Sequence, residues 1–422
     1  MSRRTPHESW PKVQTRRIAR SLARRIREYT EPDPVGLDLP EVTGADLAIH
    51  FADGPQKFYQ LQPWLAVLQE RTDLSVIIVC RGPEAYLPLR AITDLPIALV
   101  PRFDQLMRLY DRANFRAVLY VNNSYTNFQS LAFQQAVHIH VNHGESDKIC
   151  MVSNQAKAYD LVFVAGEAAV QRHQAALAWF DLDHLVRIGR PQLDLDVPIP
   201  IPAHDGPTIT YAPTWEGEDQ ANNYTSLDCY GLAIIDAALA QRGARVIYKP
   251  HPRIPDSDDP RIRRVHQRIV QRIEQARLED PSTGHAVCVH EDILGIIRAT
   301  DLLIGDVSSV TLDHLYLRPA APIALTDRRT DRQRLIADTP VAAGSHIIDE
   351  NTIGSLAADL TVMLERDTLR GERDRLRDLY FDGLAPGEST TRFWSRLHDA
   401  IARHDGAVAG LGRLRVAAKE ES

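Results

Sequence analysis

The sequence predicts an α/β protein made of two Rossmann-like, doubly wound halves. In each half, short apolar runs alternate with amphipathic helical segments, which is typical of a parallel sheet covered on both faces. A proline-rich stretch between residues 191 and 207 separates the two series. The 422 residues, 44% of them hydrophobic, are enough for two domains with separate cores.

The N-terminal 40 residues differ from the rest in charge. Residues 1–30 contain nine arginines or lysines against two glutamates, with apolar residues near helical spacing at Val13, Ile18, Leu22 and Ile26. Such a helix can lie on an anionic membrane, where each arginine contributes about 1 kcal/mol. A solvated helix or a disordered tail is the alternative, because the apolar stripe is narrow. Prolines 32, 34 and 40 then indicate a linker.

The first half, residues 41–200, is expected to form an acceptor domain. Helices are expected at 56–70 and 167–180. The apolar runs predict strands at 45–51, 75–80, 96–100, 117–121, 136–141, 161–165 and 185–188.

The second half, residues 201–385, repeats the pattern and is expected to bind a nucleotide. Strands are predicted at 208–211, 245–248, 286–290, 302–307, 322–326 and 346–349. The predicted helices are 227–241, 261–278 and 292–299. Residues 386–422 form a C-terminal helical segment.

Several classes of protein are disfavoured by composition. The formal net charge of −7 argues against a general nucleic-acid binder. The four cysteines show no CxxC spacing, so neither a zinc site nor a disulfide framework is indicated. No apolar run of about 20 residues and no signal peptide is present, which predicts a cytoplasmic protein, either free or peripheral on the inner face of the plasma membrane through residues 1–30.

The most informative stretch is 302–315, an apolar run followed by a turn and a helix. Ser308 or Ser309 suits the N-cap of this helix, whose first N–H groups have no partner inside the helix. Free donors and the positive end of the helix dipole favour a phosphate there. An ordinary capped helix is the alternative.

Polar residues also follow other predicted strands, at the sheet edge where open α/β sheets bind ligands. The first of five such places lies in the first half of the chain, and the fifth lies beyond the strands of the second half. They are Asn142-His143-Gly144, Tyr211 to Trp215, Lys249 to Arg253, Gly305 to Ser309, and Phe381-Asp382-Gly383 followed by Glu388 to Arg392.

These five places, from about residue 115 to residue 395, resemble in order the motifs of the CDP-glycerol glycerophosphotransferase family. Those enzymes prime and polymerise the polyol phosphates of teichoic acids and related capsules. Two Rossmann-like halves joined by a proline-rich hinge constitute the glycosyltransferase B architecture, so we expect the active site in the cleft between the two halves. The first 110 residues match only in general pattern.

By this resemblance, His143 and His251 are the catalytic pair. Chemistry agrees, because an attacking hydroxyl must lose a proton and histidine titrates near neutrality. We assign His143 as the base, while His251, Lys249 and Arg253 stabilise charge on the diphosphate. The other substrate-binding residues implied are Gly144, Thr214, Trp215, Asp306, Ser308, Ser309, Asp382, Gly383, Ser389, Thr390 and Arg392. The alternatives are a core role for Trp215 and plain helix capping at Ser389.

Two departures from the family pattern bear on substrate choice. Asp306-Val307-Ser308-Ser309 stands where Asp-Tyr-Ser-Ser is usual, which keeps the helix-start donors. Glu145-Ser146 follows Gly144 where threonine is usual, which places a carboxylate next to the base and could change the acceptor. The short chain favours a primase, a short-chain transferase or a compact variant.

The expected reaction is transfer of a polyol phosphate, glycerol phosphate first, from a CDP-polyol to a hydroxyl of a lipid-linked or growing glycan, with release of CMP. No Asp-x-Asp pair ends a predicted strand, so no protein metal site is predicted, although magnesium could accompany the nucleotide. The rivals are a glycosyltransferase that uses a nucleotide sugar and a non-catalytic nucleotide-binding scaffold.

Overall fold

The computed structural model describes residues 42, 44–70 and 73–420, with side chains to residue 410. By contacts the chain divides into two compact units. Unit 1 is Met1–Ile139 with Ile401–Ser422, and unit 2 is His140–Ala400. The predicted N-terminal membrane helix lies outside the described residues. The boundaries predicted near residues 40, 200 and 385 stay predictions.

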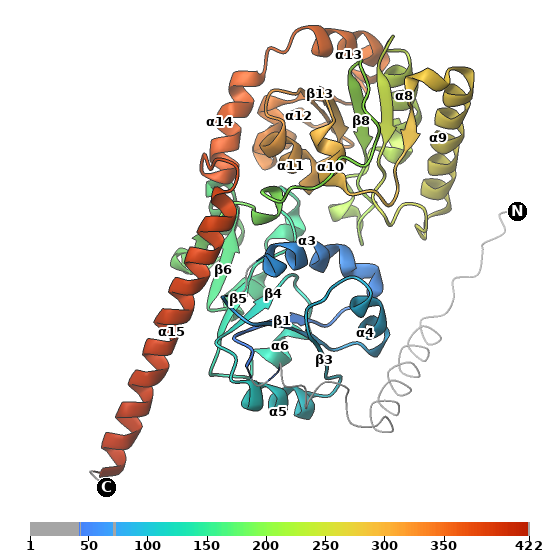
Figure 1. The fold of residues 1–422 in the computed structure, drawn as a ribbon. Coiled ribbons are helices and arrows are strands. Elements are labelled where there is room, and N and C mark those ends of the chain that lie inside the picture. Colours follow the sequence, from blue (N-terminus) through green and yellow to red (C-terminus); the bar gives the residue numbers. More distant parts are fainter. Residues whose placement is uncertain (1–41, 43, 71–72, 421–422) are drawn as a thin grey trace, which may run out of the picture. The chain divides into compact units, whose positions relative to one another are not determined.

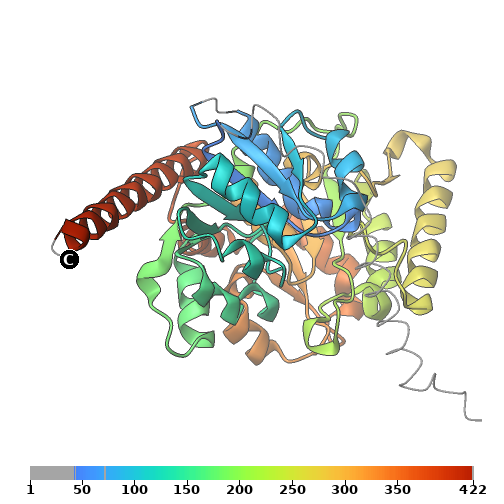
Figure 2. The same cartoon turned by 90° about the horizontal axis from the view of Figure 1, so that it is seen from below.

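The first sheet has seven strands in the order β3-β2-β1-β4-β5-β6-β7. Parallel pairing joins β1 to both β2 and β4, β2 to β3, and β6 to β7. Figures 1 and 2 show its N-terminal strands, in blue to teal, side by side. The strands are β1 (Leu47–Phe51), β2 (Val76–Cys80), β3 (Ile97–Leu99), β4 (Ala117–Tyr120), β5 (Val137–His140), β6 (Leu161–Val164) and β7 (Leu185–Arg187).

Helices connect these parallel strands, as a parallel crossover requires. Each described strand of unit 1 is almost wholly buried, which agrees with apolar runs covered on both faces. The helices are α3 (Phe58–Gln69), α4 (Pro83–Arg90), α5 (Phe103–Ala113), α6 (Asn127–Ser130) and α7 (Glu167–Ala176).

The second sheet lies within unit 2 and has the order β10-β9-β8-β11-β12-β13. Its strands are β8 (Thr208–Ala212), β9 (Arg245–Tyr248), β10 (Ala286–Val287), β11 (Leu302–Gly305), β12 (Ile323–Thr326) and β13 (His346–Ile348). Its helices are α8 (Leu227–Leu239), α9 (Pro260–Glu279), α10 (Ile293–Arg298), α11 (Ser309–Leu317), α12 (Arg332–Asp338), α13 (Leu356–Glu365) and α14 (Arg370–Phe381). A long helix, α15 (Glu388–Glu420), follows. The strand order is that of a Rossmann fold. Strands β8, β9 and β10 follow one another toward one edge of the sheet and β11, β12 and β13 toward the other, so the order reverses between β8 and β11.

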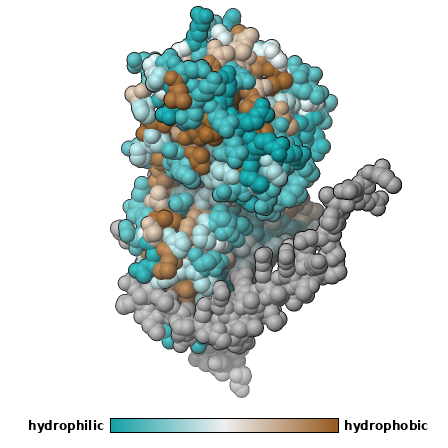
Figure 3. Space-filling model, turned by 90° about the vertical axis from the view of Figure 1, so that its right-hand side faces the viewer, coloured by the Kyte–Doolittle hydropathy of each residue, from teal (hydrophilic) through white to brown (hydrophobic). Residues whose placement is uncertain are grey.

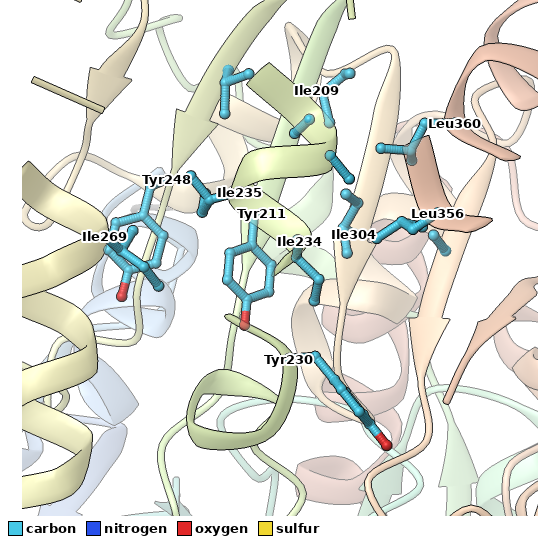
Figure 4. Packing of buried hydrophobic residues seen from close by; sticks show 14 of the residues in the cluster. Ile209, Tyr211, Tyr230, Ile234, Ile235, Tyr248, Ile269, Ile304, Leu356 and Leu360 are labelled. Carbon is cyan, nitrogen blue, oxygen red and sulfur yellow. The ribbon is translucent and has the colours of Figure 1, made fainter. Parts of the chain in front are cut away.

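Opposite faces of this sheet bury different helices. Figure 4 shows Ile304 of β11 and Tyr211 of β8 packed with Ile234 of α8, Ile269 of α9 and Leu360 of α13. Alternate residues along a strand point to opposite faces, and a second cluster accordingly forms on the other side. That cluster joins residues of β12 and β13 to α11 and α14 and includes Ile323, Leu325, Ile347, Leu312, Leu315, Tyr380 and Phe381.

The predicted fold class is confirmed, because each predicted strand is present and two parallel sheets form. Two predicted elements are too long. The helix predicted at 167–180 ends at Ala176, before Trp179, which has a positive φ of 57°. The strand predicted at 286–290 contains only two residues.

One face of the molecule is mainly hydrophilic. Figure 3 shows small, separate hydrophobic patches within this polar surface. The outer side of α9 belongs to it, with exposed Arg264 and Arg268. Within the described chain, no helix combines the length and the apolar character needed to cross a bilayer.

Candidate active site

The strand order reverses between β8 and β11, where open α/β sheets place their ligands. Thr214 follows β8 and Asp306 follows β11. The backbone N–H of Thr214 donates to Oδ2 of Asp306 at 2.7 Å. The reversal point therefore brings together two sequence-predicted segments that are far apart in the chain.

Asp306 is fully buried, and both oxygens of its carboxylate accept hydrogen bonds from other residues of the protein. Besides Thr214, Oδ1 accepts hydrogen bonds from the Ser226 N–H at 3.2 Å and from Thr326 Oγ1 at 2.6 Å. Burial raises the pKa of Asp306, while these donors oppose the rise. The structure thus gives Asp306 a positioning role: it ties together the ends of β8, β11 and β12 and the start of α8.

The helix start predicted to bind an anion is present. Ser308 precedes α11 in an extended conformation, and its Oγ is buried without a hydrogen-bond partner among the described residues. Gly144 lies against this helix start, since a β-carbon placed on it would lie 3.4 Å from Cβ of Ser309. Ser308, Ser309 and Gly144 therefore share one place in unit 2.

A buried ionic network holds the segment that follows His143. Glu145 and Asp147 both pair with Arg172 of α7, and Asp147 also accepts a hydrogen bond from Tyr380 of α14. Burial raises the pKa of Asp147 to about 7. Glu145, the carboxylate predicted to stand next to the base, is paired with Arg172.

The backbone at His143 is shaped by the preceding residue. Asn142 has a positive φ of 51°, and its Oδ1 accepts a hydrogen bond from the His143 N–H at 2.8 Å. His143 itself is only partly buried. This turn re-aims the chain after β5 and leaves the imidazole accessible to a reactant.

Lys148 adds a positive charge that sequence reasoning missed. Its Nζ donates to Thr214 Oγ1 at 2.8 Å and lies 5.8 Å from the ring centroid of Tyr224. Burial lowers the pKa of Lys148. Thr214 is thus held between Lys148 and Asp306, rather than projecting alone toward a ligand.

His251 is neutral at physiological pH. Burial, followed by the charges of Lys148, Arg253, Lys249 and His143, lowers its pKa to about 3. Its Nδ1 accepts a hydrogen bond from the Arg253 N–H at 3.2 Å, which places the ring proton on Nε2. His251 is therefore suited to donating a hydrogen bond to an anionic oxygen without itself carrying charge.

Two more cations flank His251. Lys249 is buried and donates to the Val289 carbonyl at 3.0 Å, and burial lowers its pKa. Arg253 is exposed and stacks over Trp215, with 3.7 Å between its Cζ and the ring centroid. Trp215 is partly buried and packs against the core of the second sheet. Both interpretations of Trp215, core packing and a site wall, thus fit its position.

A pocket opens beside this cluster at the end of β12. It lies next to Val307, in the segment that leads into α11, and next to Asp147 in the segment after His143. Its other lining residues include Tyr224, Arg328 and Arg329, of which Arg329 stacks on Tyr224 at 4.7 Å.

The start of α15, where the resemblance implies the substrate-binding residues Ser389, Thr390 and Arg392, is capped by a side chain of the protein. Asp194 accepts hydrogen bonds from the backbone N–H groups of Gly387 at 2.8 Å and Thr390 at 2.7 Å. Ser389 is fully buried, and Arg392 pairs with Asp382 at 3.0 Å.

The adjacent residues are also accounted for by the fold. Asp382 and Gly383 both have positive φ and form the turn after α14. These contacts fit the capping alternative, so we do not carry Asp382, Gly383, Ser389, Thr390 and Arg392 into the ligand site.

The site residues that the structure brings together in unit 2 come from several strand ends. They are His143, Gly144, Lys148, Thr214, Trp215, Lys249, His251, Arg253, Ser308 and Ser309. Five of these are lysine, arginine or a residue at the start of α11, which suits a ligand rich in phosphate. No group of three or more metal-ligating side chains is found in the described ranges.

Buried histidines predict how stability depends on pH. Burial lowers the pKa of His140, His251 and His314 to about 3 each, so the unfolded chain gains protons below about pH 6.5 that the folded chain does not. Each contributes stability that is complete above pH 6.5 and has fallen by about 2 kcal/mol at pH 5. Asp147 and Asp313, with pKa values raised to about 7 and 6, oppose this trend because the folded state binds their protons first.

The histidines outnumber the two carboxyls, so we expect the melting temperature to fall between pH 7 and pH 5. Calorimetry over that range measures the effect. His314→Gln serves as the internal check and should make the pH dependence shallower. A melting temperature that rises on acidification contradicts the assignment.

Comparisons with known proteins agree with this architecture. A variant of the wall teichoic acid polymerase TagF matches over 94% of this chain and 99% of its own, with a TM-score of 0.59 and 14% identity. HepE from Anabaena, solved with UDP and glucose, matches over 84% of this chain and 99% of its own, with a TM-score of 0.51 and 10% identity. At such identities the likeness shows the fold, which is of the glycosyltransferase B type.

Sequence comparison identifies the family. No curated protein sequence matches the chain. A family model described as CDP-glycerol:poly(glycerophosphate) glycerophosphotransferase matches residues 108–334, which is 227 of the 422 residues. This range contains both histidines, the Lys249 segment and the start of α11. The chain therefore belongs to the CDP-glycerol:poly(glycerophosphate) glycerophosphotransferase family.

Proposed function

We propose that this enzyme transfers glycerol phosphate from CDP-glycerol to a hydroxyl group of a lipid-linked or growing cell-surface glycan and releases CMP. The observation that supports this most is that the two histidines lie with three cations, Lys148, Lys249 and Arg253, and with the start of α11 in one place of unit 2. TagF soaked with CDPG is among the structural matches, which favours the same donor class.

The reaction is a displacement at the phosphorus atom nearer to glycerol. The acceptor oxygen forms a new bond to this phosphorus, the bond to the oxygen that bridges the two phosphates breaks, and CMP leaves with that oxygen. His143 takes the proton of the attacking hydroxyl. His251, through Nε2–H, and the α11 start stabilise the charge that develops on the phosphates.

The cations offset the negative charge of the donor. The charges of Lys148, Lys249 and Arg253 all lower the pKa of His251, which supports the proposal that they act on the same ligand. Electrostatic stabilisation of this kind is worth most where water is excluded, and the burial of Lys148 and Lys249 provides such surroundings. Magnesium bound to the donor itself is compatible with this arrangement.

The first 30 residues are proposed to hold the enzyme at an anionic membrane surface, where a lipid-linked acceptor lies. Their nine positive charges support this proposal. It concerns location only and does not enter the chemistry.

Thermal stabilisation by ligands tests the donor. A ligand that binds the native state raises the melting temperature by mass action. We expect CDP-glycerol, and more weakly CMP, to raise it at concentrations at which UDP-glucose and UDP-N-acetylglucosamine do not. CDP-ribitol tests the choice of polyol. Stabilisation by uridine ligands alone would replace the proposal with a sugar transferase of the same fold.

A further inference from the structure

Arg190 lies at the site and stands in the sequence just before the proline-rich stretch. It lies three residues after Arg187, the last residue of β7, and is only 8% exposed. One nitrogen, Nη2, lies 3.2 Å from Oδ1 of Asp313 on α11. Its Nε and Nη1 are buried and have no hydrogen-bond partner among the described residues. A buried guanidinium with unused donors is costly unless an acceptor arrives.

The unused nitrogen lies at the start of α11. A β-carbon placed on Gly144 would lie 3.5 Å from Nη1 of Arg190 and 3.4 Å from Cβ of Ser309. Ser308 Oγ, just before the helix, is also buried and unpartnered. Gly144 therefore lies beside several free donors, and it has no side chain to fill the space. The donors are Nη1 of Arg190, the hydroxyl of Ser308 and the N–H groups at the start of the nine-residue helix α11.

From this convergence we infer that Arg190 binds a phosphate group at the start of α11, with Asp313 as the residue that orients its guanidinium. The inference rests on the proposed function and deepens it by naming the residue that holds the transferred or leaving phosphate. The planar guanidinium can direct one edge to the carboxylate of Asp313 and another to phosphate oxygens.

The backbone around Arg190 is built to hold it in place. Gly189 has a positive φ of 71°, and a β-carbon there would lie 2.1 Å from Ser389 Oγ. The following turn is tied to the start of α15 by Asp194, which caps that helix. The start of α15 thus holds in place the segment after β7 that carries Arg190.

The charge of Asp313 fits this arrangement. The residue is 4% exposed, and burial raises the pKa of its carboxyl to about 6, with Arg190 opposing the rise. Asp313 balances part of the arginine charge while the site is empty. Nε and Nη1 of Arg190 have no hydrogen-bond partner among the described residues and stay available to an anion.

Binding of inorganic pyrophosphate to the full-length protein tests the inference, with titration calorimetry as the readout. We expect Arg190→Met to weaken pyrophosphate at least tenfold, because it removes a charged hydrogen-bond donor. Arg190→Lys should lie between wild type and Arg190→Met, since it keeps charge but loses the planar fork.

Arg318→Met is the matched control. Arg318 follows the opposite end of α11 and pairs with Asp301 at 2.7 Å. The variant therefore loses an arginine–aspartate pair, as Arg190→Met does, but leaves the site unchanged. It should bind pyrophosphate as wild type does. Equal affinity in wild type and in a folded Arg190→Met protein would overturn the inference.

A second variant keeps the test decisive if Arg190→Met does not fold. Gly144→Ala places a methyl group against Nη1 at ordinary contact distances, so the fold should tolerate it. Gly144→Ala should also weaken the binding of pyrophosphate, and an unchanged affinity would count against the inference.

The inference and the proposed function fail differently. If Arg190→Met loses its affinity for pyrophosphate but the wild type makes no product from CDP-glycerol, the phosphate site is supported and the assignment of the donor is wrong. If the wild type and Arg190→Met transfer glycerol phosphate with the same kcat and KM, the function stands and the role of Arg190 falls.

Discussion

Replacing His143 with alanine is expected to lower the turnover of glycerol phosphate transfer about a thousandfold, because a positioned general base contributes about 10² to 10⁴ to the rate. Donor binding should change little, since the cations and the α11 start remain. Steady-state kinetics with CDP-glycerol measures the first effect, and calorimetry with CMP measures the second.

Two comparison variants sharpen this test. His251→Gln should weaken CMP as well as slow turnover, because His251 is proposed to donate to the phosphates in both the ground state and the transition state. His204→Ala, at a partly buried histidine whose Nε2 lies 3.2 Å from the Gly243 carbonyl, should do neither. A folded His143→Ala enzyme with wild-type turnover would remove His143 from the mechanism.

Replacing Asp306 with alanine is expected to cost about 3 to 5 kcal/mol of unfolding free energy, the range for breaking a buried charged network. Three donors, the N–H groups of Thr214 and Ser226 and the hydroxyl of Thr326, would lose their acceptor in a fully buried place. Urea unfolding followed by circular dichroism measures the loss.

Thr326→Val is the matched variant, because it removes one of the three donors and leaves the carboxylate satisfied by the other two. It should cost about 1 kcal/mol. If Asp306→Ala were no more destabilising than Thr326→Val, the carboxylate would not be the centre of this network, and a direct role in binding ligand would regain support.

The sheets were predictable because buried parallel strands leave a local signal. The apolar runs at 208–211 and 302–307 correspond to β8 and β11 within about two residues. Helix ends were less predictable, since the end of α7 at Ala176 depends on a turn at Trp179 rather than on the apolar pattern.

The site was predictable as a set of segments but not as a set of contacts. Thr214 and Asp306 were both expected to face the ligand, yet they bond to each other across 92 residues of sequence. Ser389 was expected to bind phosphate, but the anion at that helix start is Asp194. Such long-range pairings depend on the packed fold, and a single sequence carries no local trace of them.

Arg190 was missed for a different reason. It stands between Gly189 and Pro191 at the start of the stretch interpreted as a hinge, where a single arginine is unremarkable. Lys148 was not predicted although it lies five residues after His143, because the resemblance at this place concerns the His-Gly motif. A glycine before a charged residue at a strand end was the available signal for Arg190.

The ionic network behind His143 limits how this enzyme can be re-engineered. Exchanging the segment after His143 for the threonine-type sequence of other family members would remove Glu145 and leave half of the Arg172 pairing unmet inside the protein. A chimera of that kind needs the partner positions on α7 and α14 to be exchanged along with the segment. The segment, Arg172 and Tyr380 are therefore best treated as one transplantable module.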